Sequence, residues 1–246
     1  MVSLAAPKAI EFVYPRPDAT TLALLAQRSR AVRCDRSPRI ACTHAYWHLG
    51  FNGASPLSCA REGLVAALEG ALARLPEAYS FIVFDAFRTR ETQFALYDYI
   101  HAQQKRARPE LSDDELHALT REFVAHPEKS RFRVTPHNSG GAVDLSLARD
   151  GVPLSMGTEF DEVSPRSATA WFEGDFAPDS GLSPEAWAEL RHNRRLLFNV
   201  MCEAGFVNYH AEWWHYDLGD AIWAEKHGLE PVYAAMEEEV KLLSGP

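Results

Sequence analysis

The sequence predicts an α+β fold with a small, mainly antiparallel sheet and flanking helices. Helical and extended patterns are interleaved along the chain, without the regular strand–helix alternation typical of a parallel sheet. Neither an internal repeat nor a low-complexity tract is visible. A length of 246 residues and a hydrophobic fraction of 46% are sufficient for a sizeable core. We therefore expect a single domain over residues 1–246.

The N-terminal part of the chain has the weakest periodicity. Residues 1–54 are rich in Pro, Arg and aromatic side chains, and we expect an arm and loops laid over the core. Ser55-Pro56 is a typical helix start, with Ser as the N-cap and Pro in the first turn. Apolar side chains recur at helical spacing over residues 64–75, and Pro76 is expected to end this helix.

The middle of the chain alternates between extended and helical patterns. Residues 79–84 are β-branched and aromatic, which predicts a buried strand. Thr89 is a suitable cap for a helix that continues to about residue 106. A capping box at residues 112–115 precedes another amphipathic stretch. Because residues 107–131 are polar, we expect a helical insertion on the surface.

The C-terminal half contains further elements of both kinds. Gly140-Gly141 is predicted to form a tight turn before a strand at residues 143–147. Ser183-Pro184 opens a long helix that Gly205 is expected to end. The other expected elements are two extended segments and a last helix, at residues 206–209, 212–217 and about 231–243.

Charge, hydropathy and cysteine spacing limit the partners and the cellular location that we expect for this protein. A net charge of −9 would repel a phosphate backbone, so we expect no nucleic-acid partner. No run approaches the roughly 18 apolar residues of a membrane span, and residues 1–8 do not begin a secretory signal. We therefore expect a soluble, cytoplasmic protein. The cysteines show no zinc-binding spacing, and we interpret them as idle thiols in a reducing compartment: Cys34, Cys42, Cys59 and Cys202.

Two short segments carry side chains that bind metals. His137 and Asp144 are too far apart to share one helical face neatly, but a turn at Gly140-Gly141 can fold them towards one point. The segment Glu212-Trp213-Trp214-His215 adds a second imidazole and another carboxylate. Taken alone, each segment has an ordinary explanation, either a chance His–Asp pair or an aromatic core. His210 could support a site, but we favour a hydrogen bond to nearby backbone.

Together these residue types indicate metal-assisted hydrolysis. Two His and one Asp leave a fourth position open for water, as in catalytic zinc sites. The metal would acidify that water, and Glu212 would take its proton and pass it to the leaving amine. In an ideal strand Glu212 and His215 would point to opposite faces, since their spacing is odd. The hypothesis therefore requires a bend or a loop in this segment.

In this order the segments resemble the D-alanyl-D-alanine dipeptidase family. Its motif Ser-x-His-x-x-Gly-x-Ala-x-Asp is similar to residues 135–144, and its motif Glu-x-Trp-His is intact at residues 212–215. Residues 85–88 resemble its Asp-x-Tyr-Arg stretch, and residues 156–161 resemble its Met-Gly-[Ser/Thr]-x-Phe-Asp stretch. The likeness spans about residues 79–217.

The resemblance implies a hedgehog/DD-peptidase-like fold and a role for each matching residue. One zinc ion per chain would be bound by His137, Asp144 and His215. Glu212 would be the general base and then the general acid, and Arg88 would stabilise the oxyanion. Asp161 would hold the free amino group of a dipeptide, and Thr135 would assist through its hydroxyl group.

Three departures from the family pattern lie near the expected substrate. Thr135 replaces Ser, which keeps the hydroxyl group but adds a methyl group beside a small D-Ala side chain. Phe87 lacks the hydroxyl group of the usual Tyr, and Thr89 replaces the usual Pro. The preferred dipeptide therefore stays open.

Our leading hypothesis is a cytoplasmic zinc dipeptidase for D-Ala-D-Ala or a related D-amino-acid dipeptide. Glycopeptide resistance, cell-wall recycling and nutrient scavenging all fit this activity. One alternative is a peptidoglycan D,D- or L,D-carboxypeptidase or endopeptidase, which would normally need an export signal. Another is a non-catalytic, zinc-stabilised binding module, against which Glu212 and Arg88 argue. The expected partner is a small dipeptide, with a homodimer as an option.

Overall fold

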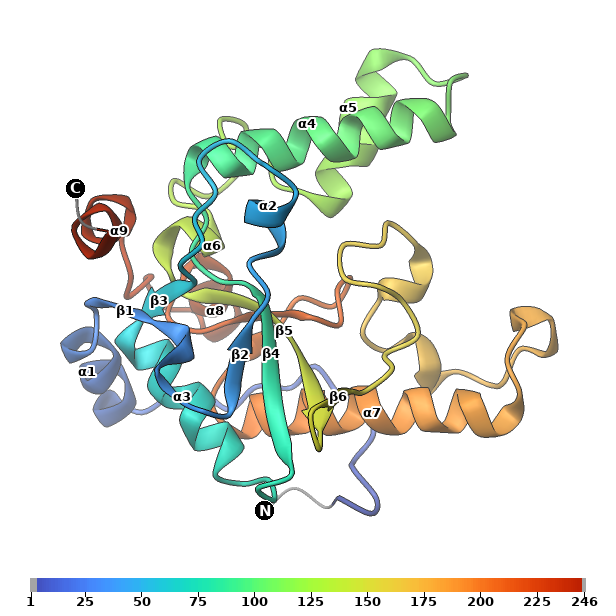
Figure 1. The fold of residues 1–246 in the computed structure, drawn as a ribbon, viewed down its shortest axis with the longest axis horizontal. Coiled ribbons are helices and arrows are strands. Elements are labelled where there is room, and N and C mark those ends of the chain that lie inside the picture. Colours follow the sequence, from blue (N-terminus) through green and yellow to red (C-terminus); the bar gives the residue numbers. More distant parts are fainter. Residues whose placement is uncertain (1–3, 245–246) are drawn as a thin grey trace.

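The computed structural model describes residues 4–244, in which helices surround a small central sheet (Figure 1). The sheet has the strand order β2-β4-β5-β8-β7, and β6 pairs with β5. Its pairs are antiparallel except for β2 with β4. The prediction of an α+β fold with a mainly antiparallel sheet is confirmed. The strands are β2 Ile40–Cys42, β4 Tyr79–Asp85, β5 Ala142–Arg149, β6 Val152–Pro153, β7 Val207–Asn208 and β8 His215–Asp217.

The main hydrophobic core lies between this sheet and two helices, α3 (Glu62–Leu72) and α7 (Pro184–Glu203). β5 is buried along nearly its whole length, because other strands flank it on both edges and helices cover it. The long helix α7 begins as predicted, with the Ser183 hydroxyl oxygen accepting a hydrogen bond from the Ala186 amide. Its apolar face joins the strands through Leu196, Leu197, Val200 and Met201.

A second sheet, of two strands, lies beside the core. β1 (Ala31–Arg33) pairs with β3 (Cys59–Arg61), and α1 (Ala19–Gln27) packs on α3. The buried Arg61 side chain donates hydrogen bonds to the carbonyl oxygens of Ser139 and Ala234. It also forms an ion pair with Glu239 of α9 (Glu237–Ser244) at 2.7 Å. Arg61 therefore ties together three segments that are far apart in sequence.

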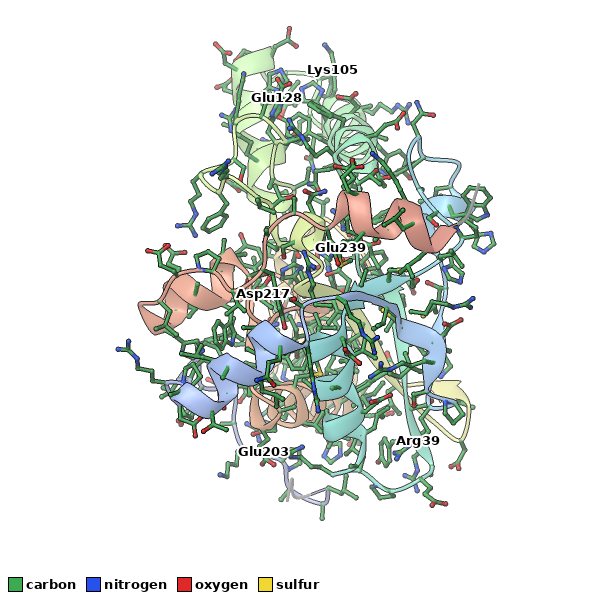
Figure 2. The ribbon with its side chains drawn as sticks, turned by 90° about the vertical axis from the view of Figure 1, so that its left-hand side faces the viewer. Arg39, Lys105, Glu128, Glu203, Asp217 and Glu239 are labelled. Carbon is green, nitrogen blue, oxygen red and sulfur yellow. The ribbon has the colours of Figure 1, made fainter. Side chains whose placement is uncertain are left out.

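Two helices form an arm that projects from the sheet (Figure 1). They are α4 (Arg90–Ala107), capped by Thr89, and α5 (Asp113–Phe123), with a capping box between Ser112 and Glu115. Figure 2 shows Lys105 of this arm and Glu128 of the loop after α5 at one end of the molecule, and Arg39 and Glu203 at the other. Both helix starts are as predicted, because capping depends only on neighbouring residues.

Two of the expected helices begin at the wrong place, and several helices were not expected. The helix expected from Ser55 begins only at Glu62, because residues 59–61 pair with β1 and the Ser55 hydroxyl instead accepts from the Leu57 amide. The last helix begins at Glu237, and residues 231–236 are not helical. α8 (Ala221–His227) was missed, although Asp220 caps it.

The N-terminal segment is more ordered than an arm with loops. Residues 1–3 of that segment lie outside the described residues. The rest includes α1, β1, α2 (Ala45–His48) and β2, which is an edge strand of the main sheet. The remaining short elements are α6 Pro136–Ser139 and the 3-10 helices Cys34–Arg36, Pro165–Ser167, Trp171–Glu173 and Pro178–Ser180. None of the helices in residues 4–244 is both long and apolar enough to cross a membrane.

Gly141 permits close packing between the turn before β5 and the segment after β8. A β-carbon at this position would lie 2.9 Å from both the Leu218 carbonyl oxygen and the Asp220 β-carbon. We expect Gly141→Ala to lower the free energy of unfolding by about 1–3 kcal/mol through overpacking. The control Gly70→Ala lies within α3 with no atom closer than 3.6 Å and should stabilise by about 0.5–1 kcal/mol. Chemical denaturation of both variants measures these changes. A Gly141→Ala variant as stable as the parent would contradict the prediction.

Candidate active site

Asp144 and His215 are directly opposite each other on β5 and β8. Because opposite residues on antiparallel strands project to the same face, their side chains meet. The Nδ1 atom of His215 lies 2.9 Å from Oδ1 of Asp144. Both side chains are buried, with exposed fractions of 7% for His215 and 2% for Asp144. Strand pairing therefore brings together two residues that are 71 positions apart.

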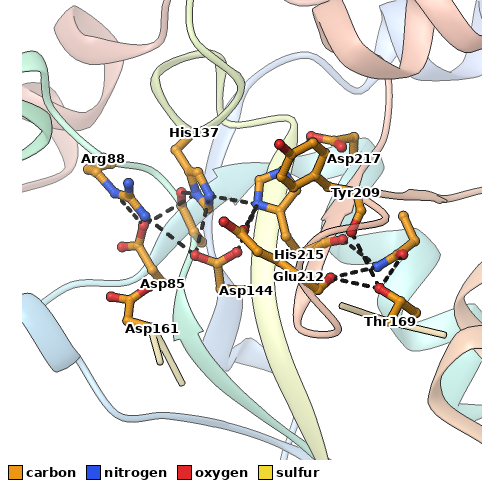
Figure 3. A network of polar contacts seen from close by, with 12 residues as sticks. Asp85, Arg88, His137, Asp144, Asp161, Thr169, Tyr209, Glu212, His215 and Asp217 are labelled. Atoms are coloured by element: carbon orange, nitrogen blue, oxygen red, sulfur yellow. Dashed lines mark hydrogen bonds and ion pairs between the residues drawn. The ribbon is translucent and has the colours of Figure 1, made fainter. Parts of the chain in front are cut away.

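His137 reaches the same point from α6. This short helix ends at Gly140, whose φ of 72° turns the chain into β5. The Nε2 atom of His137 lies 3.3 Å from Oδ2 of Asp144 and 3.2 Å from Nδ1 of His215. One donor atom from each of the three residues lies within 4.8 Å of the others (Figure 3). The expected turn at Gly140-Gly141 thus brings the side chains of His137 and Asp144 together.

The outer nitrogens of both imidazoles have acceptors. Nδ1 of His137 lies 2.6 Å from the Ala86 carbonyl oxygen, and Nε2 of His215 lies 2.9 Å from Oδ1 of Asp217. These acceptors direct the ring hydrogens outwards, so the two inner nitrogens offer lone pairs beside the Asp144 carboxylate. Three such donors repel one another unless a cation lies between them. The arrangement therefore fits a metal ion.

The ionised forms of Asp144 and His215 stabilise each other. Burial opposes ionisation of Asp144, but the His137 and His215 imidazoles hold the pKa of its carboxyl well below the ordinary value. Burial likewise disfavours a charged imidazole, yet Asp217 and Asp144 raise the pKa of His215 well above its usual range. This site therefore strongly favours positive charge, whether from a proton or from a metal ion.

Glu212 lies in the turn immediately before β8, with Oε2 4.0 Å from Nδ1 of His215. The Asn208 side-chain amide donates to the carbonyl oxygens of Glu212 and His215, at 3.0 and 2.9 Å. The Thr169 hydroxyl donates to the Glu212 carbonyl oxygen at 3.1 Å (Figure 3). The expected bend is therefore present, and it removes the difficulty of the odd spacing.

Burial raises the pKa of the Glu212 carboxyl to about 8, against the opposing effect of His215. Asp144 and Asp161 raise this pKa further by repulsion. A group with a pKa near neutrality can both accept and donate a proton under physiological conditions. A bound cation would lower the pKa of Glu212, since it stabilises the carboxylate.

Arg88 is held at the edge of the cluster by several partners. Its Nε donates to Asp85 at 2.9 Å, Nη1 to Gln93 at 3.0 Å and Nη2 to the Tyr46 hydroxyl at 3.1 Å. Its Nη2 also lies 3.4 Å from Oδ2 of Asp144. Burial favours the neutral form, but Tyr46, Asp85 and Asp144 raise the pKa of Arg88, so it remains a fixed positive charge.

Asp161 lies beside Arg88 and Tyr46. The Tyr46 hydroxyl donates to Oδ2 of Asp161 at 2.7 Å, and the backbone of Asp161 has a φ of 60°. Burial raises the pKa of the Asp161 carboxyl to about 7, although the Arg88 guanidinium lowers it. Asp161 thus offers an anionic group that is readily neutralised by a proton or an ammonium group.

All of the predicted site residues line one cavity of about 380 Å³. They are Arg88, Thr135, His137, Asp144, Asp161, Glu212 and His215. His210 does not line this cavity, and its ring contacts Phe12 and Tyr209 instead. Residues 121–126 and 129–132 also line the cavity, so the end of the segment expected as a surface insertion contributes to the site.

Several residues of the site were not recognised from the sequence. Asp217 had a usable signal, because it is two residues from His215 on a strand and therefore shares its face. Tyr46, Gln93 and Asn208 carried no such signal, since each reaches the site through contacts between distant segments.

Three side chains that could hold a metal ion, a half-buried carboxyl group and an arginine in one cavity are the arrangement expected of a metal-dependent hydrolase. A family model described as D-ala-D-ala dipeptidase matches residues 59–232. The chain belongs to this family of metallopeptidases.

Similar proteins carry the same name as this family. A protein of Synechocystis sp. named D-alanyl-D-alanine dipeptidase is 31% identical over 74% of this chain and 78% of its own length. A protein of the same name from Enterococcus faecium is 28% identical over 63% of this chain and 70% of its own length. A third, from Escherichia coli, is 37% identical over 35% of this chain and 38% of its own length.

The raised pKa of Asp161 predicts a pH-dependent stability. The folded chain holds this proton up to a pH of about 7, whereas the unfolded chain releases it near 3.8. Between these values the folded state binds more protons, so the free energy of unfolding falls as the pH rises. In chelator-treated protein, Asp161→Asn should reduce the loss of melting temperature between pH 5 and pH 7.5. The exposed control Asp175→Asn should leave it unchanged, and identical losses in both variants would contradict the prediction.

Proposed function

We propose that this protein is a zinc-dependent dipeptidase that hydrolyses D-Ala-D-Ala or a related D-amino-acid dipeptide. The convergence of His137, Asp144 and His215 beside Glu212 is the observation that carries the proposal. Family membership supports it, as do the relatives named D-alanyl-D-alanine dipeptidase. Two imidazoles and one carboxylate are a usual ligand set for catalytic zinc with one open position.

In this proposal one zinc ion is bound by His137, Asp144 and His215. When bound, zinc would acidify a water molecule and polarise the scissile carbonyl group. Asp217 and the Ala86 carbonyl orient the two imidazoles by accepting from their outer nitrogens, at 2.9 and 2.6 Å.

Glu212 is the proposed general base and then general acid. Its Oε2 lies close to the ligand cluster, and burial keeps its proton affinity high enough for transfer at neutral pH. Asn208 and Thr169 hold the turn that carries it, so the carboxyl group has a defined position. It would accept a proton at Oε2 and return it to the leaving amine.

Arg88 is the proposed donor to the oxyanion of the tetrahedral intermediate. The charge of its guanidinium is fixed by Asp85, and its orientation is fixed by Gln93 and Tyr46. Preorganised positive charge at the edge of a cavity stabilises developing negative charge without reorganisation during the reaction.

Asp161 and Thr135 are the proposed substrate-binding residues. The half-buried carboxylate of Asp161, which lines the cavity, would pair strongly with a free ammonium group, and this would favour short substrates. The Thr135 side chain makes no capping hydrogen bond to α6, so its hydroxyl group is available at the cavity. The family also supports a hedgehog/DD-peptidase-like fold, which we propose for residues 1–246 as one domain.

Metal removal should abolish hydrolysis of D-Ala-D-Ala and lower the melting temperature. The melting temperature should fall because a ligand that binds only the folded state stabilises it. Dialysis against a chelator followed by addition of zinc should restore both properties, measured by amine release and by calorimetry. Full activity in protein shown by elemental analysis to contain no metal would contradict the proposal.

Glu212→Gln should lower kcat by a factor of about 10² to 10⁴ while one zinc ion per chain is retained, because only the proton carrier is lost. A matched control is Glu122→Gln, which removes another carboxylate from the same cavity and should keep near-parental kcat. Unchanged turnover in Glu212→Gln would exclude the proposed base. Metal binding without hydrolysis in the parent protein would instead support a binding module.

A further inference from the structure

The cavity extends beyond the residues of the proposed mechanism. Residues 121–126 and 129–132, from the end of α5 into the following loop, line it together with His137, Asp144 and His215. A volume of about 380 Å³ lies in the range that holds drug-sized ligands and exceeds what two alanyl residues fill. The cavity therefore has room for a larger side chain on the substrate. We refer to residues 121–126 and 129–132 as the outer wall.

The outer wall is basic in an otherwise acidic chain. Arg121, Lys129 and Arg131 line the cavity, against a single acidic lining residue of this wall, Glu122. Arg131 is paired with Glu225 at 2.6 Å. Among the described residues, Arg121 and Lys129 make no ion pair.

The outer wall is fixed relative to Arg88. The buried Gln93 side chain accepts a hydrogen bond from Nη1 of Arg88 at 3.0 Å and donates to the Ala125 carbonyl oxygen at 2.9 Å. Val124 is buried in a small cluster with Leu96 and Ile100 of α4. Since these contacts hold the wall, a ligand that contacts it also has a defined position relative to Arg88.

The two sides of the cavity have complementary charge. Asp161 and Glu212 lie on the main body, whereas the unpaired cations lie on the outer wall. With the substrate amine at Asp161 and the scissile bond at the buried metal-binding cluster, the residue after the scissile bond faces the remaining lining. Most of that lining is the outer wall, and the rest includes Pro136, Tyr209 and Ile222.

We propose that Arg121 and Lys129 bind a carboxylate side chain on the C-terminal residue of the substrate. This assignment rests on the proposed dipeptidase function and adds to it a preference for dipeptides with an acidic second residue. Both cations are exposed at the rim, while the metal-binding cluster is buried. A side-chain carboxylate extends further from the scissile bond than the α-carboxylate does, so it matches these two groups.

The test compares D-Ala-D-Glu with its neutral isostere D-Ala-D-Gln. We expect kcat/KM to favour D-Ala-D-Glu by about tenfold at low ionic strength, the combined effect of two partly exposed ion pairs, and less at high salt. In the double variant Arg121→Gln, Lys129→Gln the ratio should fall to about one. The control Arg106→Gln removes an exposed cation of α4 that does not line the cavity, and it should keep the ratio.

Equal kcat/KM values for the two dipeptides in the parent protein, or an undiminished preference in the double variant, would overturn the proposal. A binding measurement separates this from the proposed function. Zinc-loaded Glu212→Gln is titrated with both dipeptides by calorimetry, and tighter binding of D-Ala-D-Glu supports the outer-wall assignment even without turnover. Equal affinities, or no binding of either dipeptide, would refute it. If the parent protein hydrolysed no dipeptide, the proposed dipeptidase function would be refuted. The preference of the outer wall for an acidic second residue would still be decided by the binding measurement.

Discussion

The buried charge of Asp144 is the constraint on which the site depends. A carboxylate buried at the centre of a sheet is costly unless positive charge compensates it. His215 meets Asp144 by strand pairing, and His137 meets it through the turn at Gly140. The guanidinium of Arg88 approaches from a third side. The sheet order, with β5 between β4 and β8, is what allows these three approaches.

Around this cluster, further residues determine orientation rather than chemistry. Asp217 and the Ala86 carbonyl select which imidazole nitrogens face inwards. Asn208 holds the turn that carries Glu212. The same low-polarity surroundings that make Asp144 costly also raise the pKa of Glu212 towards neutrality. Burial therefore accounts both for the need of this cluster for compensating positive charge and for the proton affinity of the Glu212 carboxyl group.

Three distant parts of the chain complete the cavity around this centre. Tyr46, from the N-terminal segment, contacts both Asp161 and Arg88. Gln93, from the α4–α5 arm, connects Arg88 to the outer wall. The N-terminal segment precedes the residues that the family model matches, whereas the cluster lies within them. Variation in substrate among related enzymes is expected at such peripheral segments, because they change the cavity without changing the chemistry.

Local chemistry is what the sequence by itself determined. Thr89, Ser112 and Ser183 cap their helices as predicted, because a cap involves only residues three positions apart. The metal site was predicted on other grounds, because two short motifs in family order carry the side-chain types that bind metals, and the structure brings His137, Asp144 and His215 within 4.8 Å of one another. The false helix start at Ser55 shows the limit: its local pattern was overridden by the pairing of β3 with β1. Only the tertiary structure decided the roles of Tyr46 and the outer wall, because their contacts join segments whose separation leaves no periodic signal.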